Sequence, residues 1–97
     1  MKKYFIVSLC KNGILGGGIS ATDDSITYKT GKLTIPDELK RIEMKYKEIR
    51  SFKSSNNFLF PTVSIEMHSG KEYKFLVFAK KNFIKLLKDK GVNVAVS

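Results

Sequence analysis

Cysteine, histidine and tryptophan are nearly absent from this chain, which has one cysteine, one histidine and no tryptophan among 97 residues. A lone cysteine, Cys10, cannot form an internal disulfide, and a zinc site needs several thiolate or imidazole ligands. We therefore predict no metal and no cofactor. The single histidine, His68, stands at the end of a predicted strand on its polar side, so we expect a solvated turn residue rather than a catalytic base.

Long hydrophobic runs are also missing, since no segment approaches the roughly 20 apolar residues that a membrane-spanning helix requires. The apolar run from Tyr4 to Val7 follows two lysines, but Ser8 breaks it before it reaches the length of a secretory signal. We expect a cytoplasmic protein with no transmembrane segment, and peripheral attachment to a membrane surface remains open.

Acidic residues are scarce: 9 acidic side chains stand against 18 basic ones, which gives a formal net charge of +9. Such a balance favours anionic partners such as lipid headgroups, nucleic acid or an acidic protein surface. The excess is spread along the chain. Residues 1–31 carry four basic and two acidic side chains, residues 32–57 seven and four, and residues 58–97 seven and three. A diffuse excess does not choose among these partners.

Period-two alternation of apolar and polar residues predicts antiparallel strands over most of the chain. Three hairpins are expected, with turns at Asn12-Gly13, Asp23-Asp24 and Ser69-Gly70. The glycines at 16–18 predict a bulge or sharp bend. They match part of a dinucleotide-binding fingerprint, but strand-like residues follow them where that motif requires a helix, so we predict no nucleotide site. The polar segment 54–57 predicts an exposed loop.

The C-terminal part changes to helical spacing. Phe83, Leu86 and Leu87 lie at i, i+3 and i+4, and Gly91 supplies a stop signal, so we predict a helix over about residues 80–90. Segment 39–52 is ambiguous, because its apolar residues fit both helical and strand spacing. Segment 36–38 is predicted as a loop or as the opening of a helix.

The order of antiparallel strands followed by one amphipathic helix resembles bacterial PH-like and GRAM-like domains, over about residues 18–91. The resemblance rests on the stretch IEMKYKEI at 42–49, on the turn before an aromatic in SGKEY at 69–73, and on the closing helix. Lys45 stands where that family usually has proline. The resemblance implies a strand at about 40–46 and a bent, partly open antiparallel barrel capped by the helix. Phe83 and its helical neighbours would then pack against strand residues such as Ile65 and Phe75.

The length of 97 residues predicts a single domain, because a chain of this size buries only one core. Together with the resemblance, this gives one PH-like domain over residues 1–97, mainly β, with strands over about 3–78, the helix over about 80–90 and a short tail at 92–97. No catalytic set is recognisable in the sequence, because the paired carboxylates at 23–24 and 37–38 fall in predicted turns. We expect a non-catalytic binding module rather than an enzyme.

Three classes of ligand follow from these features. Protein interaction or self-association is favoured, with Phe58, Leu59 and Phe60 as candidate contacts. For these residues themselves, burial in the core is the safer interpretation. The first alternative is an anionic lipid headgroup, for which the resemblance implies Lys29 and Lys32 beside the barrel mouth, together with Lys53.

Nucleic acid binding is the third class. Tyr73 and Phe75 are faintly similar to the aromatic strand of an RNA-recognition sheet. That fold needs two crossover helices, however, and these two aromatics share the predicted core face. Nucleic acid is therefore the least favoured of the three ligands.

Overall fold

Seven strands and three helical segments make up the part of the chain that the computed structural model describes, residues 3–10, 14–31, 37–57 and 60–95. Their order and bounds are β1 (Lys3–Cys10), β2 (Ile14–Ala21), β3 (Ser25–Lys29), α1 (Asp37–Lys40), β4 (Arg41–Lys45), the 3-10 turn η1 (Tyr46–Glu48), β5 (Ile49–Asn57), β6 (Phe60–Met67), β7 (Glu72–Val77) and α2 (Lys80–Asp89).

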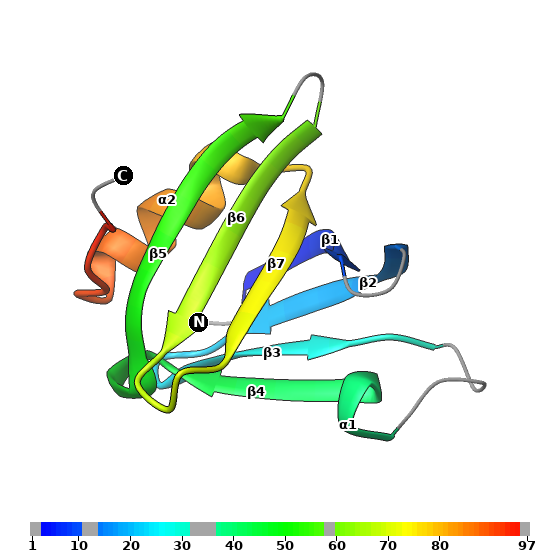
Figure 1. Cartoon of the computed structure of the whole chain (residues 1–97), viewed down its shortest axis with the longest axis horizontal. Helices are drawn as coiled ribbons and strands as arrows, with labels where there is room; N and C mark the ends of the chain where they lie inside the picture. The colour runs from blue at the N-terminus through cyan, green and yellow to red at the C-terminus, as the bar shows by residue number, and fades with distance from the viewer. Residues whose placement is uncertain (1–2, 11–13, 32–36, 58–59, 96–97) are drawn as a thin grey trace.

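The strands form one antiparallel sheet in the order β4-β3-β2-β1-β7-β6-β5. Strands β5 to β7 run at a steep angle to β1 to β4, so the sheet bends around the core, and α2 packs near the upper part of β5 and β6 (Figure 1). The predicted fold class, a mainly-β bent and partly open antiparallel barrel capped by a C-terminal helix, is confirmed. Among the described residues, no helix is long and apolar enough to cross a membrane.

The concave face of the sheet holds the core. On β1, Phe5, Val7 and Leu9 are buried, and the alternate residues Tyr4 and Ile6 point to the opposite, solvent-facing side. This solvent-facing side is called the outer face below. Because the alternation continues in the neighbouring strands, one face of the bent sheet is apolar and buried while the other meets water.

Helix α2 closes the core with one apolar stripe. Phe83, Leu86 and Leu87 are buried, and the ring of Phe83 packs edge-on against that of Phe5, with the centroids 5.1 Å apart. Each buried side chain of this size contributes about 1.5–3 kcal/mol relative to exposure. The helix ends at Asp89, one residue before the expected boundary, and Gly91 follows with a φ of +81°. That conformation is one that glycine adopts at little cost.

Segment 39–52, whose sequence fits both helical and strand spacing, contains a short helical stretch and a strand. Residues 37–40 form the single turn of α1, and β4 then covers residues 41–45, close to the strand that the family resemblance implied. Strand β4 pairs with β3 through the whole of its length, from Ser25 opposite Lys45 to Lys29 opposite Arg41. Cross-strand pairing therefore settles residues 41–45 as strand, and the 3-10 turn η1 follows them.

Two local predictions were wrong. The register of β1 with β2 runs without interruption through Gly16 and Gly18, which face Ser8 and Ile6, so the glycines form no bulge. Residues 54–57, predicted as an exposed loop, extend β5 and pair with β6. The stabilisation from pairing with β6 outweighs the weak strand propensity of serine and asparagine.

The chain after α2 returns to the sheet edge. The amide of Phe52 donates to the carbonyl of Asn93 at 3.0 Å, and the amide of Ala95 donates to the carbonyl of Phe52 at 2.8 Å. Val94 forms a parallel bridge with Phe52. The segment predicted as a tail thus covers part of the otherwise open edge of β5.

Candidate functional site

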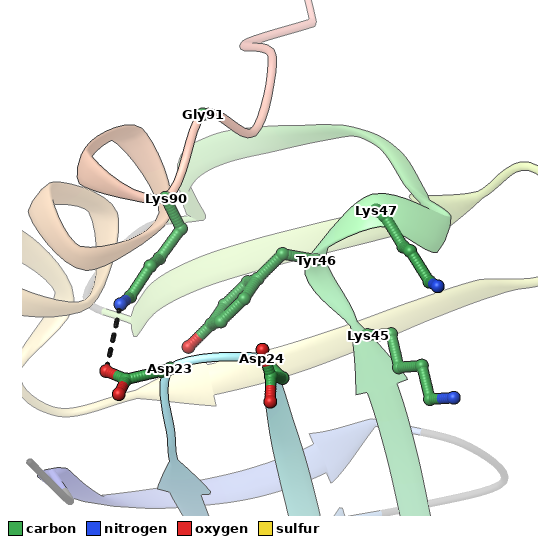
Figure 2. Close-up of a pocket in the computed structure, with 7 residues that line it drawn as sticks. All are labelled: Asp23, Asp24, Lys45, Tyr46, Lys47, Lys90 and Gly91. Atoms are coloured by element: carbon green, nitrogen blue, oxygen red, sulfur yellow. Dashed lines mark hydrogen bonds and ion pairs between the residues drawn. The ribbon is translucent and has the colours of Figure 1, made fainter.

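One open hollow of about 530 Å³ lies where the turn between β2 and β3, the end of β4 and the end of α2 meet. Figure 2 shows the seven residues that line it, which are Asp23, Asp24, Lys45, Tyr46, Lys47, Lys90 and Gly91. It brings together segments that are far apart in the sequence. Three cationic and two anionic side chains stand around a single aromatic ring.

Tyr46 is held at the centre of this hollow by two hydrogen bonds. Its hydroxyl donates to the carbonyl of Thr22 at 2.9 Å, and its amide donates to the carbonyl of Asp24 at 3.1 Å. Burial, together with the negative charges of Asp23 and Asp24, raises the pKa of its phenol to about 12. The phenol is therefore a structural donor rather than a base at neutral pH.

One ion pair joins two of the five charged side chains of the hollow. Lys90 forms an ion pair with Asp23, with 3.4 Å between Nζ and Oδ1, and lies 5.8 Å from the ring centroid of Tyr46. Figure 2 shows Lys45 and Lys47 on the side of the ring away from Lys90. No cluster of three His, Cys, Asp or Glu side chains suited to a metal occurs in the described part of the chain. The hollow mainly ties the end of α2 to the turn between β2 and β3.

The outer face of β1, β2 and β7 carries a second notable feature, a group of exposed apolar side chains. Tyr4 is 66% exposed, Ile6 63% and Phe78 68%. The amide of Phe78 donates to the carbonyl of Ile6 at 3.3 Å, which continues the register of β1 with β7 and sets these two residues opposite each other. Together these three residues form what we call the apolar patch.

The ring of Tyr4 covers part of the strand beside the apolar patch. On β2, Gly18 lies opposite Ile6, and the phenol ring of Tyr4 occupies the space that a Cβ at Gly18 would need. Gly18 is therefore buried beneath this ring. A Cβ at Gly16 would meet no atom within 4 Å, so the backbone is open only at that end of the strand.

A further hollow of about 520 Å³ adjoins the apolar patch at Phe78, where β7 passes into α2. Its other lining residues are Pro61, Ala79, Lys80, Lys81 and Asn82. No acidic side chain is among them. This end of the molecule thus combines exposed apolar surface with positive charge.

The lysines predicted as anionic-ligand contacts lie far apart in the sheet. Lys29 ends β3, next to the edge strand β4, whereas Lys53 lies in β5 at the opposite edge. Both side chains are exposed. Lys32, the third candidate, lies outside the described residues, and the structure does not gather the other two at one site.

The aromatic residues predicted as protein contacts fall largely outside what the structure describes. Phe58 and Leu59 lie outside the described residues, and Phe60 is placed only as the first residue of β6. Of the two aromatics weighed for RNA, Phe75 is fully buried and Tyr73 is half-buried against the core. The apolar patch was not anticipated. Its signal was present in the alternation of β1, where Tyr4 and Ile6 have the opposite phase to the buried Phe5.

Comparison with known proteins gives a fold and no function. No family model matches the chain, and no curated protein matches its sequence. A solved structure, the C-terminal domain of an unknown protein from Leishmania infantum, is similar with a TM-score of 0.75 at 12% identity. The match covers 91% of this chain and 80% of that one. At this identity the likeness shows the fold alone.

Proposed function

We propose that this chain is a non-catalytic PH-like binding module that contacts a protein partner through the apolar patch. One observation carries the proposal: Ile6 and Phe78 stand side by side on the outer face, each more than 60% exposed, with Tyr4 beside them. Adjacent exposed apolar side chains of this size are uncommon on a monomer surface unless they serve an interaction.

The size of the patch suits a modest interface. Full burial of one such side chain is worth about 1.5–3 kcal/mol, so burying the exposed two-thirds of three side chains gives roughly 3–6 kcal/mol. Association costs about 4 kcal/mol or more in lost freedom of motion. The patch therefore acts as the anchor of an interface whose remaining contacts come from its surroundings.

The non-catalytic part of the proposal rests on the chemistry of the hollow where the turn between β2 and β3 meets the end of α2. In the hollow around Tyr46, the phenol is bonded to a backbone carbonyl and Lys90 is paired with Asp23. Neither group is placed to activate a nucleophile. His68 is exposed at the turn after β6, where its amide donates to the carbonyl of Glu48 at 2.9 Å, and it is not among the residues that line this hollow.

A second candidate, binding to an anionic membrane surface, is favoured by one separate observation. Lys81, Lys85 and Lys88 are all exposed and follow one face of α2 at spacings of four and three residues. A lysine at an acidic membrane contributes about 1 kcal/mol, so three give roughly 3 kcal/mol, weaker than millimolar binding. This stripe alone supports only transient attachment.

The test compares two variants that remove equally exposed apolar side chains. Ile6→Ser with Phe78→Ser removes the patch, and Ile14→Ser serves as the control, because Ile14 is 61% exposed but stands opposite Cys10, about 13 Å along β1 from Ile6. Affinity capture from the cells that express the protein is quantified for all three proteins. Light scattering after gel filtration separates self-association from a different partner.

The proposal predicts that wild type and Ile14→Ser retain the same associated polypeptide, or the same self-association, and that the patch variant loses it. Retention of every association by a correctly folded patch variant would contradict the proposal. Co-sedimentation with phosphatidylserine vesicles tests the membrane alternative, which predicts loss of binding in Lys81→Glu with Lys85→Glu and no effect of the patch variant.

A further inference from the structure

The apolar patch is one end of a longer row of side chains that crosses the sheet. Successive registers place Arg41 opposite Lys29, Lys29 opposite Gly18, and Gly18 opposite Ile6, while Phe78 continues the row beyond Ile6. Residues paired across antiparallel strands point to the same face. The outer face therefore carries two cations, then Gly18 beneath the ring of Tyr4, and then two large apolar side chains.

The two cations of the row form no ion pair with any residue that the structure describes. Lys29 and Arg41 are directly opposite each other and exposed, and like charges in that position repel. Glu43 is the next residue on the same face of β4 and lines one hollow with both cations, but its carboxylate accepts a hydrogen bond from the hydroxyl of Ser25 at 3.4 Å.

We propose that the partner of this face is a carboxylate-rich segment of another protein that lies across the strands, with its acidic residues on Lys29 and Arg41 and an apolar residue on Ile6 and Phe78. This inference rests on the proposed function and adds the chemistry of the partner. A carboxylate on the segment removes the repulsion between the two cations. The apolar residue reaches the hollow beside Phe78, where Lys80 and Lys81 offer further positive charge.

The spacing of the row sets the pattern of the partner. Strands β3 and β1 are two positions apart in the sheet, which corresponds to about 10 Å. An extended chain covers that distance in about three residues, at about 3.3 Å per residue, but its side chains alternate between two faces, so only residues an even number apart face the sheet together. The partner segment should therefore carry Asp or Glu two or four residues from a large apolar residue.

The same geometry disfavours two other occupants. A second copy of this chain would bring two molecules of net charge +9 together and would offer no acidic residue from the row itself. A membrane would place cations nearer the headgroups than the apolar side chains along the bilayer normal. In this protein the cations and Ile6 project from the same face of the sheet. They are therefore separated along the surface and not in depth along a bilayer normal.

The experiment is a selection of random 12-residue peptides on the immobilised full chain, followed by affinity measurement for enriched peptides at two salt concentrations. The row is tested with Lys29→Glu plus Arg41→Glu and, separately, with Phe78→Ser. The matched charge control is Lys85→Glu plus Lys88→Glu, which makes the same change in net charge on the exposed face of α2. Circular dichroism confirms that each variant is folded.

The inference predicts enriched peptides with an acidic residue two or four positions from an apolar one. Their affinity should fall at least tenfold in the Lys29 and Arg41 variant and in Phe78→Ser, and less than threefold in the α2 control. Peptides that depend on Phe78 but are not acidic would overturn the inference and leave the proposed function standing. Peptides indifferent to both variants, or no enrichment, would overturn both. Binding to phosphatidylserine vesicles that depends on Lys29 and Phe78, without acidic peptides, would assign the face to a membrane and overturn the inference.

Discussion

Two neighbouring glycines of β2 should respond in opposite ways to the same substitution. A Cβ at Gly17 would stand 2.3 Å from the carbonyl oxygen of Lys29 and 3.0 Å from Cε1 of Tyr28, whereas a Cβ at Gly16 would meet nothing within 4 Å. Real Cβ atoms essentially never approach another atom closer than 3.0 Å, so Gly17→Ala must move backbone by about 0.7 Å. Because the obstacle is a paired strand, the pairing of β2 with β3 has to yield.

The magnitude follows from two terms. Replacing a strand glycine by alanine gains about 0.5–1 kcal/mol of conformational free energy at either position. Overpacking costs about 1–3 kcal/mol, and only Gly17→Ala incurs it. The gain cancels between the two variants, so the free energy of unfolding of Gly17→Ala should lie about 1–3 kcal/mol below that of Gly16→Ala.

Urea unfolding monitored by circular dichroism measures this difference directly. In a domain of this size 1 kcal/mol corresponds to about 4–8 °C in Tm, so thermal unfolding gives an independent measurement. Gly16→Ala should equal or exceed the wild type. Equal stabilities of the two variants, within about 0.5 kcal/mol, would refute the close approach of β2 and β3 at Gly17.

Three other predictions concern the core, the hollow around Tyr46 and the surface. Phe83→Ala should cost about 3–5 kcal/mol in urea unfolding, since the ring is fully buried against Phe5; a cost under about 1 kcal/mol would contradict the packing of α2. The pKa of Tyr46 is about 12 in the folded protein and 10.0 ordinarily. The stability that its phenol contributes is therefore complete below pH 10 and is lost as the pH rises towards 12. Tyr46→Phe should therefore be less stable than wild type at about pH 8, by about 1 kcal/mol for the lost bond to Thr22, with the gap narrowing by about pH 11; a constant gap would refute the raised pKa. Phe78→Ser should change unfolding free energy by no more than about 0.5 kcal/mol, because the side chain is exposed, and a larger loss would show that it supports the fold.

Local pattern was enough to predict the hairpins and the closing helix. The helix prediction came from the spacing of Phe83, Leu86 and Leu87, and these residues are buried as expected. Residues 54–57 were mispredicted, because their strand state depends on pairing with β6 rather than on their own propensities.

The row on the outer face could not be predicted from local pattern at all. It exists because β1 lies between β2 and β7, which brings Ile6 beside Phe78 from the other end of the chain. The family resemblance implied that Lys29 contacts an anionic ligand at the mouth of the barrel. The structure sets it instead in a cross-strand pair with Arg41. Long-range strand order, which no local periodicity encodes, decided both positions.

The most direct test of the central claim is a map of backbone amide chemical shifts during titration with an enriched acidic peptide. Binding of the acidic segment across the outer face predicts the largest chemical-shift changes along the row, at Ile6, Gly18, Lys29 and Phe78, with little change around Tyr46. Changes centred instead on the hollow around Tyr46, with the row unaffected, would contradict the assignment of the outer face as the binding surface.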